Sequence, residues 1–185
     1  GLVNTLVVPV QPESAALSDV NRLIRDSRDI NLLVSANTVL TANSLNGLAR
    51  TARALGRVKP ASITYTYPFP INGNESTSAP APARVMSALR PALGVLDRSG
   101  ITARIKGLPA CHLGDDAHRL GQTSNRYYVD ADHQCDNAMM FFPDVVRFFK
   151  SDGCRVCGLD GKCDGFFATY LRRPGFPSLE PVDKS

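Results

Sequence analysis

The first part of the chain alternates between short apolar segments and longer amphipathic ones, and this alternation constrains the fold more than any other feature. Runs rich in β-branched and apolar residues predict strands over residues 6–10, 30–40, 62–67 and 101–105. Apolar residues at helical spacing predict helices between them, over residues 18–26, 43–56 and 84–98. Strands that alternate with helices predict a parallel sheet with crossover helices. Four strands cannot close an eight-stranded barrel, so we expect an α/β fold that forms a partial (β/α) barrel.

Polar and small residues at the expected helix ends agree with this interpretation. Ser18 is placed to cap the first helix, and Asn43 with Ser44 to cap the second. Gly56 is predicted to end the second helix, because glycine readily adopts the left-handed backbone of a helix terminus.

Three cysteines, Cys154, Cys157 and Cys163, lie within ten residues in a loop rich in Gly and Asp. A structural zinc site usually takes its ligands from two separated knuckles, whereas here one CxxC pair is followed at once by the third thiol. This crowding favours an iron–sulfur cluster, in which several thiolates surround one compact cage. A zinc ion is the alternative, and disulfides or free thiols are the remaining interpretation.

A cluster of the [4Fe-4S] type binds four thiolates, or three with one open iron. Two further cysteines are candidates for the fourth ligand. Cys111 follows the last predicted strand in a segment with Gly and Pro, and Cys135 lies in a polar loop. Either one is otherwise expected to be a small buried apolar residue.

Composition excludes several classes of protein. The net charge of +4 is mild and its basic residues are scattered, so we expect no nucleic-acid partner. No run of apolar residues is long enough to span a membrane, and the first residues lack the pattern of a signal peptide. The odd count of five cysteines argues against a secreted disulfide framework and predicts a cytoplasmic protein.

The remaining polar candidates are expected to be structural. The histidines, His112, His118 and His133, are predicted to pack or to face solvent rather than to bind metal. The pair Asp115–Asp116 is predicted to form a solvated turn, and Asp130 and Asp132 share a face if that stretch is a strand. An aromatic block over residues 139–149 is predicted to form core beneath the cysteine loop.

Four stretches of the chain carry a resemblance to one enzyme family. They are residues 34–43, 65–73, 107–111 and 154–166, the last followed by Tyr170, Gly175 and Pro181. In this order and at this spacing the chain resembles the C-terminal half of a radical S-adenosylmethionine (radical SAM) enzyme. The likeness is to members with an auxiliary-cluster extension of the twitch or SPASM type.

The resemblance implies two regions and a set of ligands. Residues 1–110 would be the C-terminal part of a partial barrel, and residues 111–185 the auxiliary iron–sulfur extension. It favours Cys111 over Cys135 as the fourth ligand of a [4Fe-4S] cluster. Asn37, near the end of a predicted strand, would face the cofactor pocket, with a structural cap as the alternative.

One departure from the family decides what this chain is expected to do. The CxxxCxxC loop, which binds the cluster that cleaves S-adenosylmethionine, is absent from the sequence. We therefore expect a C-terminal portion or a split subunit, which binds S-adenosylmethionine only together with a missing N-terminal half or a partner that carries CxxxCxxC. Its substrate, a small molecule or a peptide, does not follow from the fold. The alternative is a non-catalytic accessory module with a structural zinc or iron–sulfur site.

Overall fold

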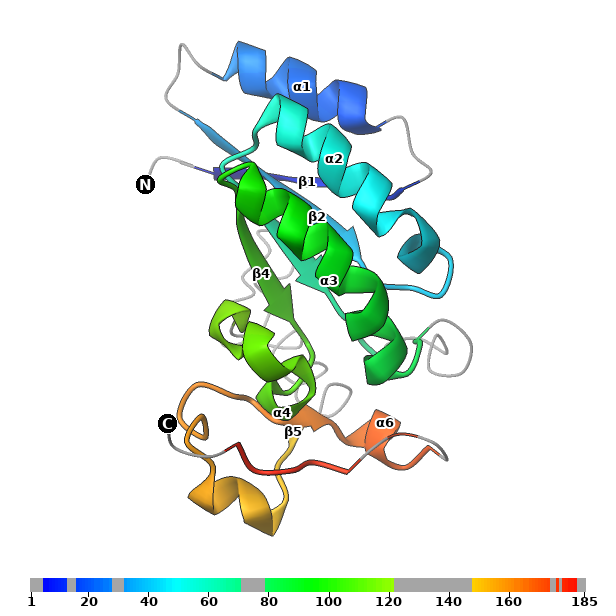
Figure 1. The fold of residues 1–185 in the computed structure, drawn as a ribbon, viewed down its shortest axis with the longest axis vertical. Helices are drawn as coiled ribbons and strands as arrows, with labels where there is room; N and C mark the ends of the chain where they lie inside the picture. The colour runs from blue at the N-terminus through cyan, green and yellow to red at the C-terminus, as the bar shows by residue number, and fades with distance from the viewer. Residues whose placement is uncertain are drawn as a thin grey trace, which may run out of the picture.

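The computed structural model describes residues 5–12, 16–27, 32–70, 79–121, 148–173, 176 and 178–182. A four-stranded parallel sheet in the order β1-β2-β3-β4 forms its centre (Figure 1). The strands are β1 (Thr5–Pro9), β2 (Leu33–Val39), β3 (Ser62–Thr66) and β4 (Thr102–Lys106). The helices that connect them are α1 (Ala16–Asp26), η2 (Ser44–Gly47) with α2 (Leu48–Val58), and α3 (Pro82–Arg98). The predicted α/β fold with a parallel sheet is therefore confirmed.

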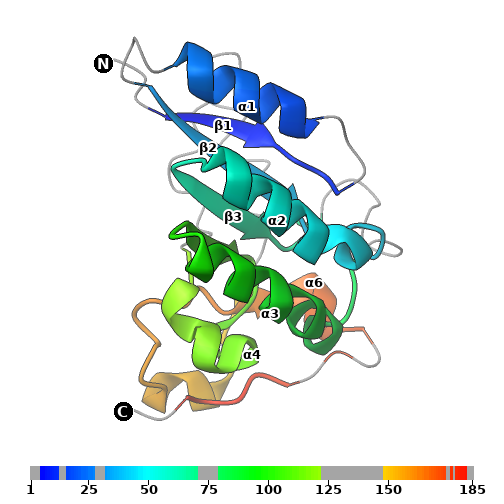
Figure 2. The same cartoon turned by 45° about the horizontal axis from the view of Figure 1, so that its top comes forward.

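The three long helices lie side by side on one face of the sheet, as Figure 2 shows. Val8, Ala36, Ile63 and Ala103 stand in register across the four strands, and all four are buried in the main core. Leucines of α2 and α3 pack against the same core. Burial of this face accounts for the apolar positions that made the strands and helices predictable.

The opposite face of the sheet carries small polar and basic side chains, together with the exposed apolar residues Val7 on β1 and Leu33 on β2. Ser35 and Ser62 are hydrogen-bonded through their hydroxyl groups at 2.9 Å, and Thr66 donates to Asn37 Oδ1 at 2.8 Å. Arg104 continues this face on β4 and is exposed. The helix-covered face of the sheet is thus buried and apolar, whereas the opposite face is mixed.

The helix ends differ from those expected. α2 runs past Gly56 to Val58, and Lys59 takes the left-handed conformation there with φ of 52°. Gly56 instead lies inside the helix, where an added Cβ would meet the Ser99 side chain. Asn43 occupies the N-cap position but makes no capping hydrogen bond.

Two expected serine caps also differ. Ser44 Oγ accepts from the Thr41 backbone N–H at 2.9 Å and donates to the Val39 carbonyl, so it closes a turn rather than caps a helix. Ser18 lies within α1, which begins at Ala16. For Ser44 the difference arises because local hydrogen bonds to the preceding turn compete with capping.

The remaining described elements lie beyond the carboxyl ends of the strands (Figure 1). They are α4 (Ala110–Leu113), η3 (Gly114–Arg119), β5 (Phe148–Phe149), η5 (Asp152–Val156), β6 (Phe166–Phe167) and α6 (Ala168–Leu171). β5 and β6 form an antiparallel pair. None of the helices in the described ranges is long and apolar enough to cross a membrane.

Aromatic side chains join this region to the sheet. The Tyr67 ring meets the Tyr170 ring edge-on at 5.4 Å, and the Phe148 and Phe167 rings lie 4.7 Å apart. Tyr170 also donates to the Pro68 carbonyl at 3.0 Å, across 102 residues of sequence. Of the block predicted to form core beneath the cysteine loop, Phe148 packs against the core, whereas Phe149 is exposed. Residues 139–147 lie outside the described ranges.

The predicted solvated turn at Asp115–Asp116 is correct for one residue only. Asp115 is exposed, but the Asp116 side chain is 16% exposed and pairs with Arg119 Nε at 3.1 Å. Arg119 also pairs with Asp97 at the end of α3 at 2.7 Å. Local sequence patterns do not indicate this contact, because Asp97 and Arg119 are 22 positions apart.

Candidate metal centre

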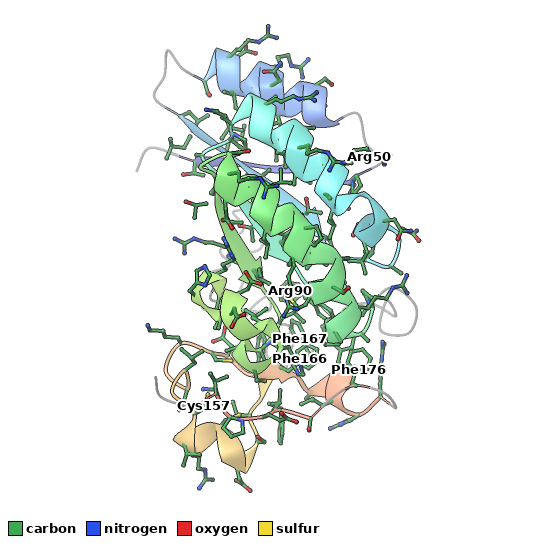
Figure 3. The ribbon with its side chains drawn as sticks, in the orientation of Figure 1. Arg50, Arg90, Cys157, Phe166, Phe167 and Phe176 are labelled. Atoms are coloured by element: carbon green, nitrogen blue, oxygen red, sulfur yellow. The ribbon has the colours of Figure 1, made fainter. Side chains whose placement is uncertain are left out.

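The structure brings four of the five cysteines to one cavity beyond the end of β4. Cys111 reaches it from α4, Cys154 from η5, Cys157 from the end of η5, and Cys163 from the turn before β6. All four are partly buried and none forms a disulfide. Figure 3 places Cys157 below the Phe166–Phe167 pair, on the side away from the sheet.

Backbone N–H groups point at two of the sulfurs. Cys163 Sγ accepts from the N–H groups of Ala110 and Gly165, each at 3.4 Å. Cys157 Sγ accepts from Leu159 at 3.5 Å and from Val182 at 3.4 Å. Such donors stabilise sulfur as thiolate, and they are one of the means by which proteins set the potential of a cluster.

The other two sulfurs also have partners. Ser151 Oγ lies 3.5 Å from Cys154 Sγ, and either atom can donate. The backbone of Glu180 forms a hydrogen bond with the Cys111 thiol. Every sulfur in the cavity is therefore hydrogen-bonded by the protein.

Gly165 allows the chain to turn at the last of these cysteines. Its φ is +90°, and a Cβ there would overlap the carbonyl oxygen of Phe149 on the neighbouring strand β5. Only glycine accommodates both conditions. The same residue donates one of the two N–H groups that Cys163 accepts.

Electrostatics in the cavity act against a bare thiolate at Cys111. Burial raises the pKa of the Cys111 thiol, the Glu180 hydrogen bond opposes this, and the charges of Cys163 and Cys154 raise the pKa further. A bound cation reverses this balance, since metal ligation requires the deprotonated sulfur.

Four further residues of the wall were not predicted: Lys150, Asp160, Leu179 and Glu180. Lys150 and Asp160 form an ion pair across the loop at 2.8 Å. The segment from Leu179 to Val182 folds over the cavity, and the Gly158 N–H donates to the Val182 carbonyl at 2.8 Å. The hydrogen bonds of this segment are made by backbone groups, so the types of its side chains do not indicate them.

The four sulfurs line the cavity without converging on a single point. Among the residues that the structure describes, no group of three or more His, Cys, Asp or Glu side chains is placed to hold one metal ion. A zinc ion bound by thiolates needs sulfur at ~2.3 Å on every side.

Of the two histidines in the described ranges, His112 packs and His118 lies at the surface; His112 Nε2 is buried without a hydrogen-bond partner among the described residues. The His112 ring is part-buried near Phe166, with ring centroids 6.3 Å apart, and burial lowers its pKa. His118 Nδ1 lies 2.9 Å from the Asp115 carbonyl at the surface. His133, Asp130 and Asp132 lie outside the described residues, and so does Cys135.

Asn37 lies away from the cysteines, on the polar face of the sheet. Its side chain accepts a hydrogen bond from Thr66 on the adjacent strand β3, so it is not the helix cap considered as an alternative. Whether it contacts a cofactor stays a prediction.

Comparison of the chain with known protein families, with curated proteins and with solved structures finds no match.

Proposed function

We propose that this chain binds a [4Fe-4S] cluster through Cys111, Cys154, Cys157 and Cys163. We further propose that it is the C-terminal portion or a split subunit of a radical SAM enzyme. The observation that carries the proposal is the cavity in which four thiols meet and each sulfur has a hydrogen-bond partner.

The donor set supports a cluster over a single ion. In a four-iron cluster each thiolate binds a different iron, so the sulfurs surround a cage and are farther apart than four sulfurs around one zinc ion. Thiols that share a cavity without converging on one point suit the cage.

The four-thiol cavity also bears on what a cluster would do. Four protein thiolates fill the ligand positions of a four-iron cluster and leave none for substrate. We therefore assign the centre to electron transfer, as the acceptor of the electron left after hydrogen abstraction. The apolar residues Pro109, Ala110 and Leu179 form part of the cavity wall.

The fold supports the second part of the proposal only in outline. Four parallel strands in sequential order, with their helices on one face, are compatible with half a (β/α) barrel and also with a Rossmann-like sheet. In such folds the reacting groups gather at the carboxyl ends of the strands, and the cysteine cavity lies beyond that end of β4.

Anaerobic purification and metal analysis test the cluster. We expect iron and acid-labile sulfide with a brown absorbance, and loss of all three in the variant with Cys154, Cys157 and Cys163 changed to Ser. Stoichiometric zinc without sulfide would contradict the cluster and support the alternative of a non-catalytic module with a structural metal.

Single substitutions identify the fourth ligand. Cys111→Ala should lose more iron than Cys135→Ala, because Cys111 follows a strand and lines the cavity. If both variants retain the same amount of iron, the cluster is held by three thiolates and an external group.

A cleavage assay tests the role of the chain within an enzyme. The chain reduced with dithionite should form no 5′-deoxyadenosine from S-adenosylmethionine, because it lacks the CxxxCxxC loop. Formation should begin when a polypeptide with that loop is added or fused upstream. Multiple turnovers by this chain alone would instead make the C-terminal cysteines the catalytic centre.

A further inference from the structure

Lys150 is the one cation among the residues that the described structure places in the wall of the cysteine cavity. It follows β5 directly, and its Nζ donates to the backbone carbonyl of Asp160 at 2.7 Å and to Asp160 Oδ1 at 2.8 Å. Asp160 lies between Cys157 and Cys163 in sequence. The side chain of Lys150 thus spans from the strand to the middle of the cysteine loop.

The charge of Lys150 interacts with the sulfurs as well as with Asp160. The hydrogen bond to Asp160 is the main cause of the raised pKa of Lys150, burial opposes it, and the charges of Asp160, Cys163 and Cys154 add to it. A second cation on the loop, Arg155, differs in position. Its side chain is 84% exposed and pairs with a fully exposed Asp152, whereas the side chain of Lys150 is 37% exposed.

We propose that Lys150 is a positioning and tuning residue of this centre, with its ammonium group held beside the sulfurs by Asp160 so that the reduced cluster is favoured. This inference rests on the proposed cluster. A cluster held by thiolates is negatively charged, and reduction adds one electron, so a fixed cation nearby stabilises the reduced state more than the oxidised state. Asp160 has the opposite charge and the opposite effect.

The test is the reduction midpoint of the reconstituted chain, followed by its absorbance during a titration with a reductant. At a fixed applied potential, Lys150→Met should lower the ratio of reduced to oxidised cluster about threefold to tenfold. This corresponds to a midpoint potential lower by ~30–60 mV for one electron. Solvent screening limits the effect to this size, because the side chain is partly exposed. Lys150→Arg should stay within about twofold of the wild type.

The Asp160→Asn variant distinguishes an electrostatic effect of Lys150 from a purely structural one. It keeps the backbone carbonyl that Lys150 uses and removes a negative charge, so it should raise the midpoint while Lys150→Met lowers it. A residue that only braced the loop would give shifts of the same sign, or loss of iron, in both variants. Arg155→Gln is the matched control on the same loop and should change the ratio less than twofold.

The outcomes separate the two proposals. A wild-type chain without iron and sulfide would overturn both of them. A wild-type cluster whose midpoint is the same in Lys150→Met would overturn the role of Lys150 alone, as would shifts of equal sign in Lys150→Met and Asp160→Asn. If Lys150→Met loses the cluster, retention in Lys150→Arg supports the role of charge, and loss in both variants overturns it.

Discussion

The sheet with its helices and the cysteine loop are stabilised in different ways. In the sheet layer every strand and long helix contributes buried apolar side chains to one core. In the cysteine loop, by contrast, no residue from 148 to 164 is buried, and its contacts include turns, two ion pairs, hydrogen bonds to sulfur and the packing of Phe148 on Phe167. The comparison teaches that apolar burial defines the first region, whereas turns and polar contacts define most of the second.

The largest effect is expected when three cysteines of the loop are replaced. Changing Cys154, Cys157 and Cys163 to Ser together should abolish iron binding and speed hydrogen exchange across residues 150–165. Exchange in β2, β3 and α3 should stay within a few-fold of the wild type, because their core does not include the loop. Equal acceleration in both regions would show that the sheet depends on the metal.

The converse experiment weakens the sheet layer. Leu89 on α3 is fully buried, and Leu89→Ala should lower the free energy of unfolding by about 2–5 kcal/mol. Iron content of the protein that remains folded should not change. Ser87→Ala on the exposed side of the same helix is the control, with an expected change within about 0.5 kcal/mol, measured by urea denaturation.

Substitutions of two glycines, Gly165 and Gly161, test how the structure of the turn affects iron binding in the loop. Gly165→Ala places a Cβ against the Phe149 carbonyl at a φ of +90°, so it should cost about 1–3 kcal/mol or more and lower iron content. Gly161→Ala meets open space and should bind iron like the wild type. Equal iron content in the two variants would contradict the structure of the turn.

The smallest effect concerns the contact that joins the two regions. Tyr170→Phe removes the hydrogen bond to Pro68 but keeps the ring that packs on Tyr67. It should lower the free energy of unfolding by about 1–2 kcal/mol, through the unpaired buried carbonyl. Thermal denaturation measures this change, with Phe69→Leu as a control for altered packing. An unchanged Tm in Tyr170→Phe would mean that solvent satisfies the Pro68 carbonyl.

The parts of the molecule that were predictable are those built from side-chain periodicity. Val34, Ala36 and Ile63 mark strands because burial on a sheet selects apolar residues at alternate positions. Cys111 was favoured as the partner of the loop cysteines, and the structure does place it in their cavity. Its proposed ligand role is still a prediction, and so is the division of the chain at residue 110.

The parts that were missed depend on backbone groups or on distant partners. Val182 contributes only its N–H and carbonyl to the cavity, so its side chain carries no sign of the contact. Asp116 looked solvated because its neighbours in sequence are polar, while Arg119 and Arg90 are the groups that face it. Gly56 was misread because Lys59 takes the left-handed conformation instead.

The position of Glu180 and Val182 has a consequence for biosynthesis. Both residues emerge from the ribosome after all four cysteines of the cavity, and Val182 follows Cys157 by 25 residues. Domains fold as their segments emerge, so the strands and helices of the sheet are complete while the cavity still lacks a wall. The wall made by Leu179 to Val182 therefore closes the cavity only after the sheet has formed, and a chain stalled before Leu179 exposes its thiols to oxidation.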